Sequence, residues 1–156
     1  MRRSQMLYAA ISIIIILLDQ ITKFYAVQLL KGNAPVVIIE NFLRLNYVEN
    51  FGAAFGILQN KKIFFIIITT IVVIGIIVYI KTNTNLTITM KIALAMVIGG
   101  AIGNLIDRVR LGYVIDFVDV NFWGLYDFPV FNIADSSIVI ATILICYLVI
   151  FNKYEL

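Results

Sequence analysis

Long apolar stretches alternate with short polar segments along the chain. Four apolar stretches can be delimited, at about residues 7–29, 63–80, 90–106 and 132–151. Each is close to the roughly 20 residues that an α-helix needs to cross about 30 Å of hydrocarbon. The pattern therefore predicts an α-helical integral membrane protein with four transmembrane helices. An even number of spans places both termini on one side of the membrane.

The connecting segments have patterns of their own. Residues 43–48 alternate apolar and polar positions, which is the period of a half-buried strand, and a glycine-containing turn follows. Residues 113–120 also have the pattern of a strand. Next comes an aromatic cluster suited to the lipid headgroup region, made up of Phe122, Trp123, Tyr126, Phe128 and Phe131. The turn at residues 82–87 is short and polar, so we expect function on the side of the two longer connections.

Composition agrees with a location in a bilayer. Of the 156 residues 62% are hydrophobic, and the mean hydropathy is +1.02. A soluble domain of this size could not bury so much apolar surface around one core. We find no repeat, low-complexity tract or linker, which predicts a single integral membrane domain over residues 1–156. The first apolar run continues past Asp19 and Lys23 with no convincing cleavage site, so we expect it to stay attached rather than to be a cleaved signal peptide.

The charged residues give more information about binding partners than about the orientation of the chain in the membrane. The formal net charge is only +3 and the basic residues are scattered, which argues against nucleic acid as a partner. The basic residues are almost equally divided between the two sides of the predicted membrane, so the positive-inside rule gives a weak answer. The pair Arg2 and Arg3 beside the first span favours cytoplasmic termini. The two longer connections would then lie at the extracytoplasmic face.

The residue types present limit the kinds of catalytic and metal site that the chain can form. The chain has no histidine and one cysteine, Cys146, so an internal disulfide is impossible and a zinc site lacks its usual ligands. We therefore expect no metal and no other cofactor. Two aspartates at the edges of apolar stretches, Asp116 and Asp135, are the best available centre. Ionisable groups so close to lipid are costly and usually functional, and two converging carboxylates could share a proton and activate a water.

Local sequence also offers simpler explanations for these polar residues. Asp135 precedes an apolar helix, where an aspartate is an expected N-cap. Asp116 on a surface strand would ordinarily be solvated, and Asn50, placed before Gly52, could be only a turn residue. Local spacing alone therefore falls short of an enzyme assignment.

Polar and small residues inside the predicted spans mostly indicate structural roles. Asp19 and Lys23 share a helix face, so a mutually neutralised ion pair explains them better than catalysis does. Ala95, Gly99 and Gly103 place small residues every four positions, which predicts close helix packing.

The end of the third span carries further polar residues. Asn104 and Arg108 share a helix face, and the five donors of an arginine suit the positioning of peptide carbonyls or a carboxylate. Asp107, next to Arg108, could equally be an interfacial charge.

Two other classes of function stay open on the residues alone. A serine protease would pair Ser136 or Ser137 with Lys23, although neither serine has a base near it in the sequence. A proton or ion pathway would use the intramembrane aspartate and lysine residues. It requires polar residues that recur across the bilayer, and the second and fourth apolar stretches contain few.

Five motifs in order along the chain resemble those of the lipoprotein signal peptidase family, the type II signal peptidases. They are Asp19-Gln-Ile-Thr-Lys, Glu49-Asn-Phe-Gly-Ala-Ala-Phe-Gly, Gly103-Asn-Leu-Ile-Asp-Arg, Val114-Ile-Asp-Phe and Phe131-Asn-Ile-Ala-Asp-Ser-Ser. The resemblance covers essentially the whole chain. It implies a small extracytoplasmic β-cradle beside the four helices, and Asp116 and Asp135 as the catalytic pair of an aspartic endopeptidase. It also implies a mainly structural ion pair of Asp19 with Lys23, and a set of residues that line or order the site: Asn50, Gly52, Asn104, Arg108 and Asn132.

The same resemblance implies the reaction and its setting. A family member hydrolyses the peptide bond immediately before a diacylglyceryl-modified cysteine and so removes the signal peptide of a prolipoprotein. It does so in the bacterial cytoplasmic membrane, with cytoplasmic termini and the site at the extracytoplasmic face. The expected partners are prolipoprotein substrates and membrane lipid, with no obligate protein partner evident. As a mechanistic hypothesis, one aspartate takes a proton from the attacking water while the other, protonated, donates to the carbonyl oxygen.

Overall fold

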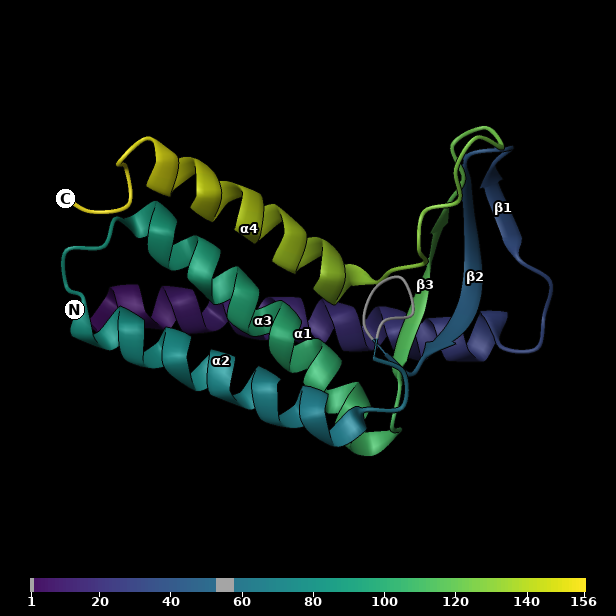
Figure 1. Ribbon diagram of the computed structural model, residues 1–156, viewed down its shortest axis with the longest axis horizontal. Coiled ribbons are helices and arrows are strands. Elements are labelled where there is room, and N and C mark those ends of the chain that lie inside the picture. Colours follow the sequence, from purple (N-terminus) through teal and green to yellow (C-terminus); the bar gives the residue numbers. More distant parts are fainter. Residues whose placement is uncertain (1, 53–57) are drawn as a thin grey trace.

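A computed structural model describes residues 2–52 and 58–156, with side chains from residue 5 onward. In chain order the elements are α1 (Arg2–Leu30), β1 (Val36–Ile39), β2 (Leu43–Asn50), α2 (Lys62–Thr82), α3 (Ile88–Arg110), β3 (Val114–Val120) and α4 (Ile133–Ile150) (Figure 1). Two parts of the sequence analysis lie outside the described residues: the side chains of Arg2 and Arg3, and residues 53–56 of the second motif.

Each of the four predicted spans is confirmed as a helix of membrane-crossing length and composition. Strands are found at both predicted places, residues 43–50 and 114–120. The short strand β1 was not predicted, because its four residues Val-Val-Ile-Ile are all apolar and do not alternate. The extracytoplasmic β-cradle that the resemblance implies therefore corresponds to three strands.

Helix α3 lies at the centre of the bundle and contacts each of the other three helices. Its small residues make this possible, as predicted. A Cβ atom at Gly99 would lie 2.9 Å from Ile15 Cβ on α1, and one at Gly103 would lie 2.6 Å from a carboxylate oxygen of Asp19. The hydroxyl of Ser12 reinforces this packing by donating to the carbonyl oxygen of Ala95, 2.7 Å away.

The strands form one antiparallel sheet in the order β1-β2-β3. Figure 1 shows the sheet at one end of the bundle, against the last turns of α1, which extends further than the other helices. An apolar cluster of Ala26 and Leu30 from α1 with Ile115 and Phe117 from β3 fixes this arrangement. The register of the sheet places Val48 opposite Asp116, so the end of β2 lies beside the carboxylate.

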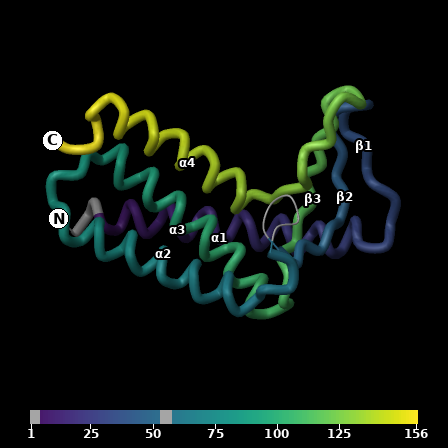
Figure 2. Tube along the Cα trace, viewed as in Figure 1, coloured from purple at the N-terminus to yellow at the C-terminus, as the bar shows by residue number. Residues whose placement is uncertain are grey.

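The opposite end of the bundle is apolar. Leu86, Met90 and Leu94 of the α3 region pack there against Leu148 of α4. The backbone N–H of Thr87 donates to the carbonyl oxygen of Tyr154 at 2.9 Å, so the C-terminal residues close this end. Both termini lie at this end, as an even number of spans requires (Figure 2).

Candidate active site

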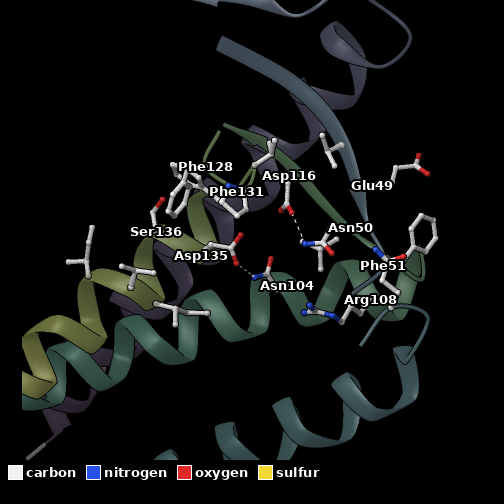
Figure 3. A pocket seen from close by; sticks show the side chains of 18 residues that line it. Glu49, Asn50, Phe51, Asn104, Arg108, Asp116, Phe128, Phe131, Asp135 and Ser136 are labelled. Atoms are coloured by element: carbon white, nitrogen blue, oxygen red, sulfur yellow. Dashed lines mark hydrogen bonds between the residues drawn. The ribbon is translucent and has the colours of Figure 1, made fainter. Parts of the chain in front are cut away.

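A cavity of about 790 Å³ lies between the sheet and the neighbouring ends of α3 and α4. Its lining contains Asp116 from β3, Asp135 from α4, and Asn104 and Arg108 from α3. Figure 3 shows these side chains converging on the cavity from different elements. The two aspartates that the sequence singles out are therefore brought together, although they lie on separate elements.

The Asp116 carboxylate is held by two amides. Its side chain is buried, and its Oδ1 accepts from Asn132 Nδ2 at 2.6 Å while its Oδ2 accepts from Asn50 Nδ2 at 2.9 Å. Asp116 is thus not the solvated strand residue that local sequence favours. Asn50 also keeps its turn role, because its Oδ1 accepts from the backbone N–H of Gly52 at 2.9 Å.

Asp135 takes part in capping α4, but not as the expected N-cap residue. The N-cap is Asn132, whose Oδ1 accepts from the Asp135 N–H at 2.9 Å, and Asp135 occupies the third helical position of a capping box. The Asp135 Oδ2 accepts from the Asn132 N–H at 3.2 Å. Its Oδ1 accepts from Asn104 Nδ2 at 2.7 Å, so this carboxylate caps the helix and also belongs to the site.

The three asparagines have fixed orientations. In each of them the side-chain oxygen accepts from a group that can only donate: the Gly52 N–H for Asn50, the Asp135 N–H for Asn132, and the Lys23 ammonium for Asn104. Each NH₂ group therefore points toward a carboxylate. All four oxygens of Asp116 and Asp135 consequently accept a hydrogen bond from the protein.

Electrostatics favour a shared proton on this pair. The pKa of Asp116 is raised from 3.8 to about 7. Burial is the largest cause and the negative charge of Asp135 adds to it, whereas hydrogen bonds from Asn50 and Asn132 oppose the rise. Two carboxylates facing one cavity resist simultaneous ionisation. Near neutral pH the pair can therefore hold one proton and one negative charge.

Arg108, for which the sequence predicts a positioning role, lies at the edge of the site and lines the cavity. Its Nη2 donates to the Gly52 carbonyl oxygen at 3.1 Å, and the guanidinium sits over the Phe65 ring, 4.8 Å from the ring centre. These contacts fix the guanidinium at the cavity, and among the described residues only Gly52 accepts a hydrogen bond from it. Gly52 and Arg108 are thereby brought to the same wall.

The predicted ion pair of Asp19 and Lys23 is present and has a third member. Lys23 Nζ lies 2.9 Å from Asp19 Oδ2 and 2.8 Å from Asp107 Oδ2, with all three residues at most 3% exposed. Asp107 is therefore not an interfacial charge. A sequence signal for this existed, because Asp107 lies three residues after Asn104 and so shares its helix face.

Neither rival class of function finds support in the described residues. The hydroxyls of Ser136 and Ser137 donate to the carbonyl oxygens of Asn132 and Met96, each at 3.0 Å, and the partners of the Lys23 ammonium include neither serine. A pathway across the membrane would need buried polar groups at both ends of the bundle. The end beyond Ser12 is instead closed by the apolar cluster around Leu86 and Leu148.

Comparisons with known proteins agree with this architecture. A family model described as "Signal peptidase (SPase) II" matches residues 11–151. The lipoprotein signal peptidase of Caldanaerobacter subterraneus subsp. tengcongensis is 51% identical over 140 residues, covering 88% of this chain and 92% of that protein. That of Halothermothrix orenii is 46% identical over 138 residues, covering 87% and 90%.

Solved structures show the same fold. One bacterial membrane enzyme aligns with a TM-score of 0.87 at 38% identity, covering 94% of this chain and 88% of that one. A second bacterial membrane enzyme aligns with a TM-score of 0.82 at 39% identity, covering 91% of each chain. The four long helices and the small sheet are thus shared with membrane enzymes of known structure.

Proposed function

The chain belongs to the signal peptidase II family of aspartic peptidases, and we propose that Asp116 and Asp135 are the carboxylates with which it cleaves prolipoproteins. Lipoprotein signal peptidase activity follows from this membership. One observation carries the assignment of the residues. The two carboxylates come from β3 and α4, line one cavity, and have every oxygen held by an N–H donor.

The proposed reaction uses the pair in its singly protonated state. The ionised carboxylate takes a proton from a water as its oxygen bonds to the scissile carbonyl carbon, and the protonated carboxyl donates to the carbonyl oxygen. When the tetrahedral intermediate collapses, the carbon–nitrogen bond breaks and a proton passes to the leaving amine. The pKa of Asp116 near 7 supports this state at neutral pH. The proton belongs to the pair rather than to one residue.

The remaining site residues have supporting roles in this proposal. Arg108 holds peptide carbonyls of the substrate with the guanidinium donors that Gly52 does not use. Asn50, Asn104 and Asn132 hold the carboxylates in place, and Gly52 fixes the orientation of Asn50. No metal or other cofactor is needed for this chemistry.

The cavity supports a lipid-modified substrate. Next to the carboxylates its lining continues along α4 through Ile138, Val139 and Ile140, of which Val139 and Ile140 are each 57% exposed on the outside of the bundle. A diacylglyceryl group on the substrate cysteine could therefore remain in lipid while the adjacent peptide bond reaches the carboxylates. We infer that the substrates are diacylglyceryl-modified prolipoproteins and that no obligate protein partner is required.

We also infer the orientation and the setting. The sheet lies at the end of the bundle opposite both termini (Figures 1 and 2), and strands β2 and β3 contribute to the cavity lining, so cytoplasmic termini correspond to an extracytoplasmic site. The four helices of membrane-crossing length and the bacterial origin of the relatives support a multi-pass protein of the bacterial cytoplasmic membrane. Residues 1–156 act as one peptidase domain in this proposal.

The deciding experiment compares two precursors with purified protein in lipid. A lipid-modified prolipoprotein should be cleaved and the unmodified precursor should not, and Asp116→Asn should abolish the cleavage. Asp119→Asn is the matched control, because Asp119 is a buried aspartate of the same strand that pairs with Arg44 at 2.6 Å. Normal cleavage by Asp116→Asn would refute the catalytic assignment, and equal cleavage of both precursors would refute the lipid requirement.

A further inference from the structure

The buried ion cluster of Asp19, Lys23 and Asp107 does more than neutralise itself. Its members lie beside the cavity, and none of them lines it. The Lys23 ammonium has three hydrogens, and it donates to three acceptors at 2.8–2.9 Å: Asp19 Oδ2, Asp107 Oδ2 and Asn104 Oδ1. One carboxylate would suffice to compensate the charge of one ammonium, and this one has two. The third contact leads toward the active site.

The contact with Asn104 reaches both proposed catalytic residues. Because an ammonium can only donate, it holds the oxygen of the Asn104 amide and turns the NH₂ group toward Asp135, 2.7 Å away. The same Asn104 oxygen accepts from Asn132 Nδ2 at 3.1 Å, and that NH₂ group donates to Asp116 at 2.6 Å. The cluster is therefore two hydrogen bonds away from Asp135, and Asn132 links it to Asp116.

Two backbone contacts make the connection more specific. Asp19 Oδ1 accepts from the N–H of Ala134 at 3.0 Å, and Ala134 immediately precedes Asp135. Asp107 Oδ2 accepts from the N–H of Ile115 at 3.1 Å, and Ile115 immediately precedes Asp116. Each carboxylate of the cluster thus anchors the residue before one of the two proposed catalytic aspartates.

We propose that Asp19, Lys23 and Asp107 form a positioning unit that holds Asp116 and Asp135 in place and sets the pH range in which the pair shares one proton. This inference rests on the proposed function of Asp116 and Asp135. The unit acts through Asn104, Ala134 and Ile115 and does not touch the substrate.

The charges around the pair determine the direction of the effect. Burial raises the pKa of Asp116 most, Asp135 raises it further, and Lys23 lowers it. Besides the pair, the charged residues that line the cavity are Arg108 on α3 and Glu49 on β2, which is paired with Lys31 at 2.9 Å; Asp119 on β3 is paired with Arg44 on β2 at 2.6 Å. Replacing one carboxylate of the cluster with an amide removes a negative charge from the neighbourhood of the pair. The ionised form of the pair then becomes more favourable.

The test is the pH dependence of turnover in Asp107→Asn. Asparagine keeps the shape and leaves one oxygen for the Lys23 ammonium and the Ile115 N–H. We expect the pH profile of kcat to move to lower pH by about half a unit to one unit, since a nearby opposite charge of this kind lowers a carboxyl pKa. KM for a lipid-modified prolipoprotein should change by less than about twofold, because binding shared by ground and transition states is untouched. A merely structural defect would lower the amount of active enzyme without moving the profile.

Two further variants complete the experiment. Asp19→Asn removes the other negative charge and should move the profile in the same direction, so it decides the matter if Asp107→Asn fails to fold. Asp119→Asn removes a buried, ion-paired aspartate with no bond to Asn104, Ala134 or Ile115, and its profile should stay with that of the wild type. A folded Asp107→Asn or Asp19→Asn enzyme with an unmoved profile would overturn the inference. Activity of Asp116→Asn tests the catalytic assignment separately.

Discussion

Two pairs of aspartates lie side by side in this protein, and they are built differently; three of the four are buried, and Asp135 is half-buried. Asp19 and Asp107 have the Lys23 ammonium between them and lie outside the cavity. Asp116 and Asp135 line the cavity and accept only from amide and backbone N–H groups. Among the residues that the structure describes, no lysine or arginine lies within 4.0 Å of either of these carboxylates.

The difference explains how one residue type serves two purposes in the same bundle. A buried carboxylate with a cation and satisfied hydrogen bonds stays ionised and holds elements together. A buried carboxylate without a cation is stabilised more easily by a proton, which it can then give to a reacting group. The counter-cation therefore separates the structural pair from the proposed catalytic pair, and each prediction below changes one side of this comparison.

The largest effect is expected when one carboxylate of the pair without a cation is replaced by an amide. Asp116→Asn or Asp135→Asn should lower turnover of a lipid-modified prolipoprotein by at least about 10³-fold, because proton transfer by a positioned carboxyl contributes roughly 10²–10⁴-fold and both residues take part. Single-turnover cleavage by purified variants in lipid measures this loss. Turnover within tenfold of the Asp119→Asn control would contradict the assignment of the pair.

The next effect belongs to the pair that has a cation. Lys23→Met leaves Asp19 and Asp107 buried without a counter-charge, so the free energy of unfolding should fall by about 3–5 kcal/mol. Unfolding in detergent, followed by heat or denaturant, measures the change. Lys31→Met is the control, because its ion pair with Glu49 is exposed to solvent and should contribute at most about 1 kcal/mol. Equal destabilisation by the two variants would show that the buried cluster does not hold the bundle together.

Sequence alone reached the helices and the individual aspartates, but not their partnership. Runs of apolar residues as strong as 63–80 are specified locally, so the helix there, Lys62–Thr82, is found within a few residues. The strand β1 is not predicted by the sequence pattern, because its structure depends on pairing with β2 rather than on alternating residues. Tertiary structure also buries both faces of β3 over residues 114–117, and thus encloses Asp116.

In the site too, sequence alone gives local roles but not the contacts that tertiary structure creates. Local rules correctly assign Asn50 to a turn and connect Asp135 with helix capping, although the N-cap itself is Asn132. Both residues have a second contact that only the folded chain creates. Local sequence does not distinguish the two roles of Asp107, because its partners lie on α1 and β3. A local role therefore does not exclude a catalytic one, since one oxygen of a carboxylate can cap a helix while the other faces the active site.

A smaller effect is expected from a change of pH, which alters the protonation of the pair without a cation. Because the pKa of Asp116 lies near 7, the pair should lose its shared proton above that pH, and kcat should fall up to about tenfold between pH 7 and 8. The folded state holds this proton more tightly than the unfolded state, whose aspartate has a pKa near 3.8. Stability is therefore greatest below pH 3.8 as far as Asp116 is concerned and decreases as the pH rises toward 7.

This pH prediction has its own control. Asp116→Asn should remove that part of the pH dependence of unfolding, whereas Asp119→Asn should retain it. The measurement is the unfolding midpoint in detergent at a series of pH values, beside the pH profile of kcat. A wild-type protein whose turnover is constant from neutral to alkaline pH would show that the pair does not need its proton.

The smallest effect is expected at the two serines that follow Asp135. The Ser136 and Ser137 hydroxyls donate to the carbonyl oxygens of Asn132 and Met96, and neither is hydrogen-bonded to Lys23. Replacing both with alanine should therefore leave kcat within about twofold, while loss of the buried Ser137 hydrogen bond lowers stability by about 1 kcal/mol. Parallel cleavage and unfolding measurements on the double variant separate the two quantities. If one of these serines were the nucleophile, the double variant would lose turnover with little change in stability. That result would show that Asp116 and Asp135 are not the catalytic residues.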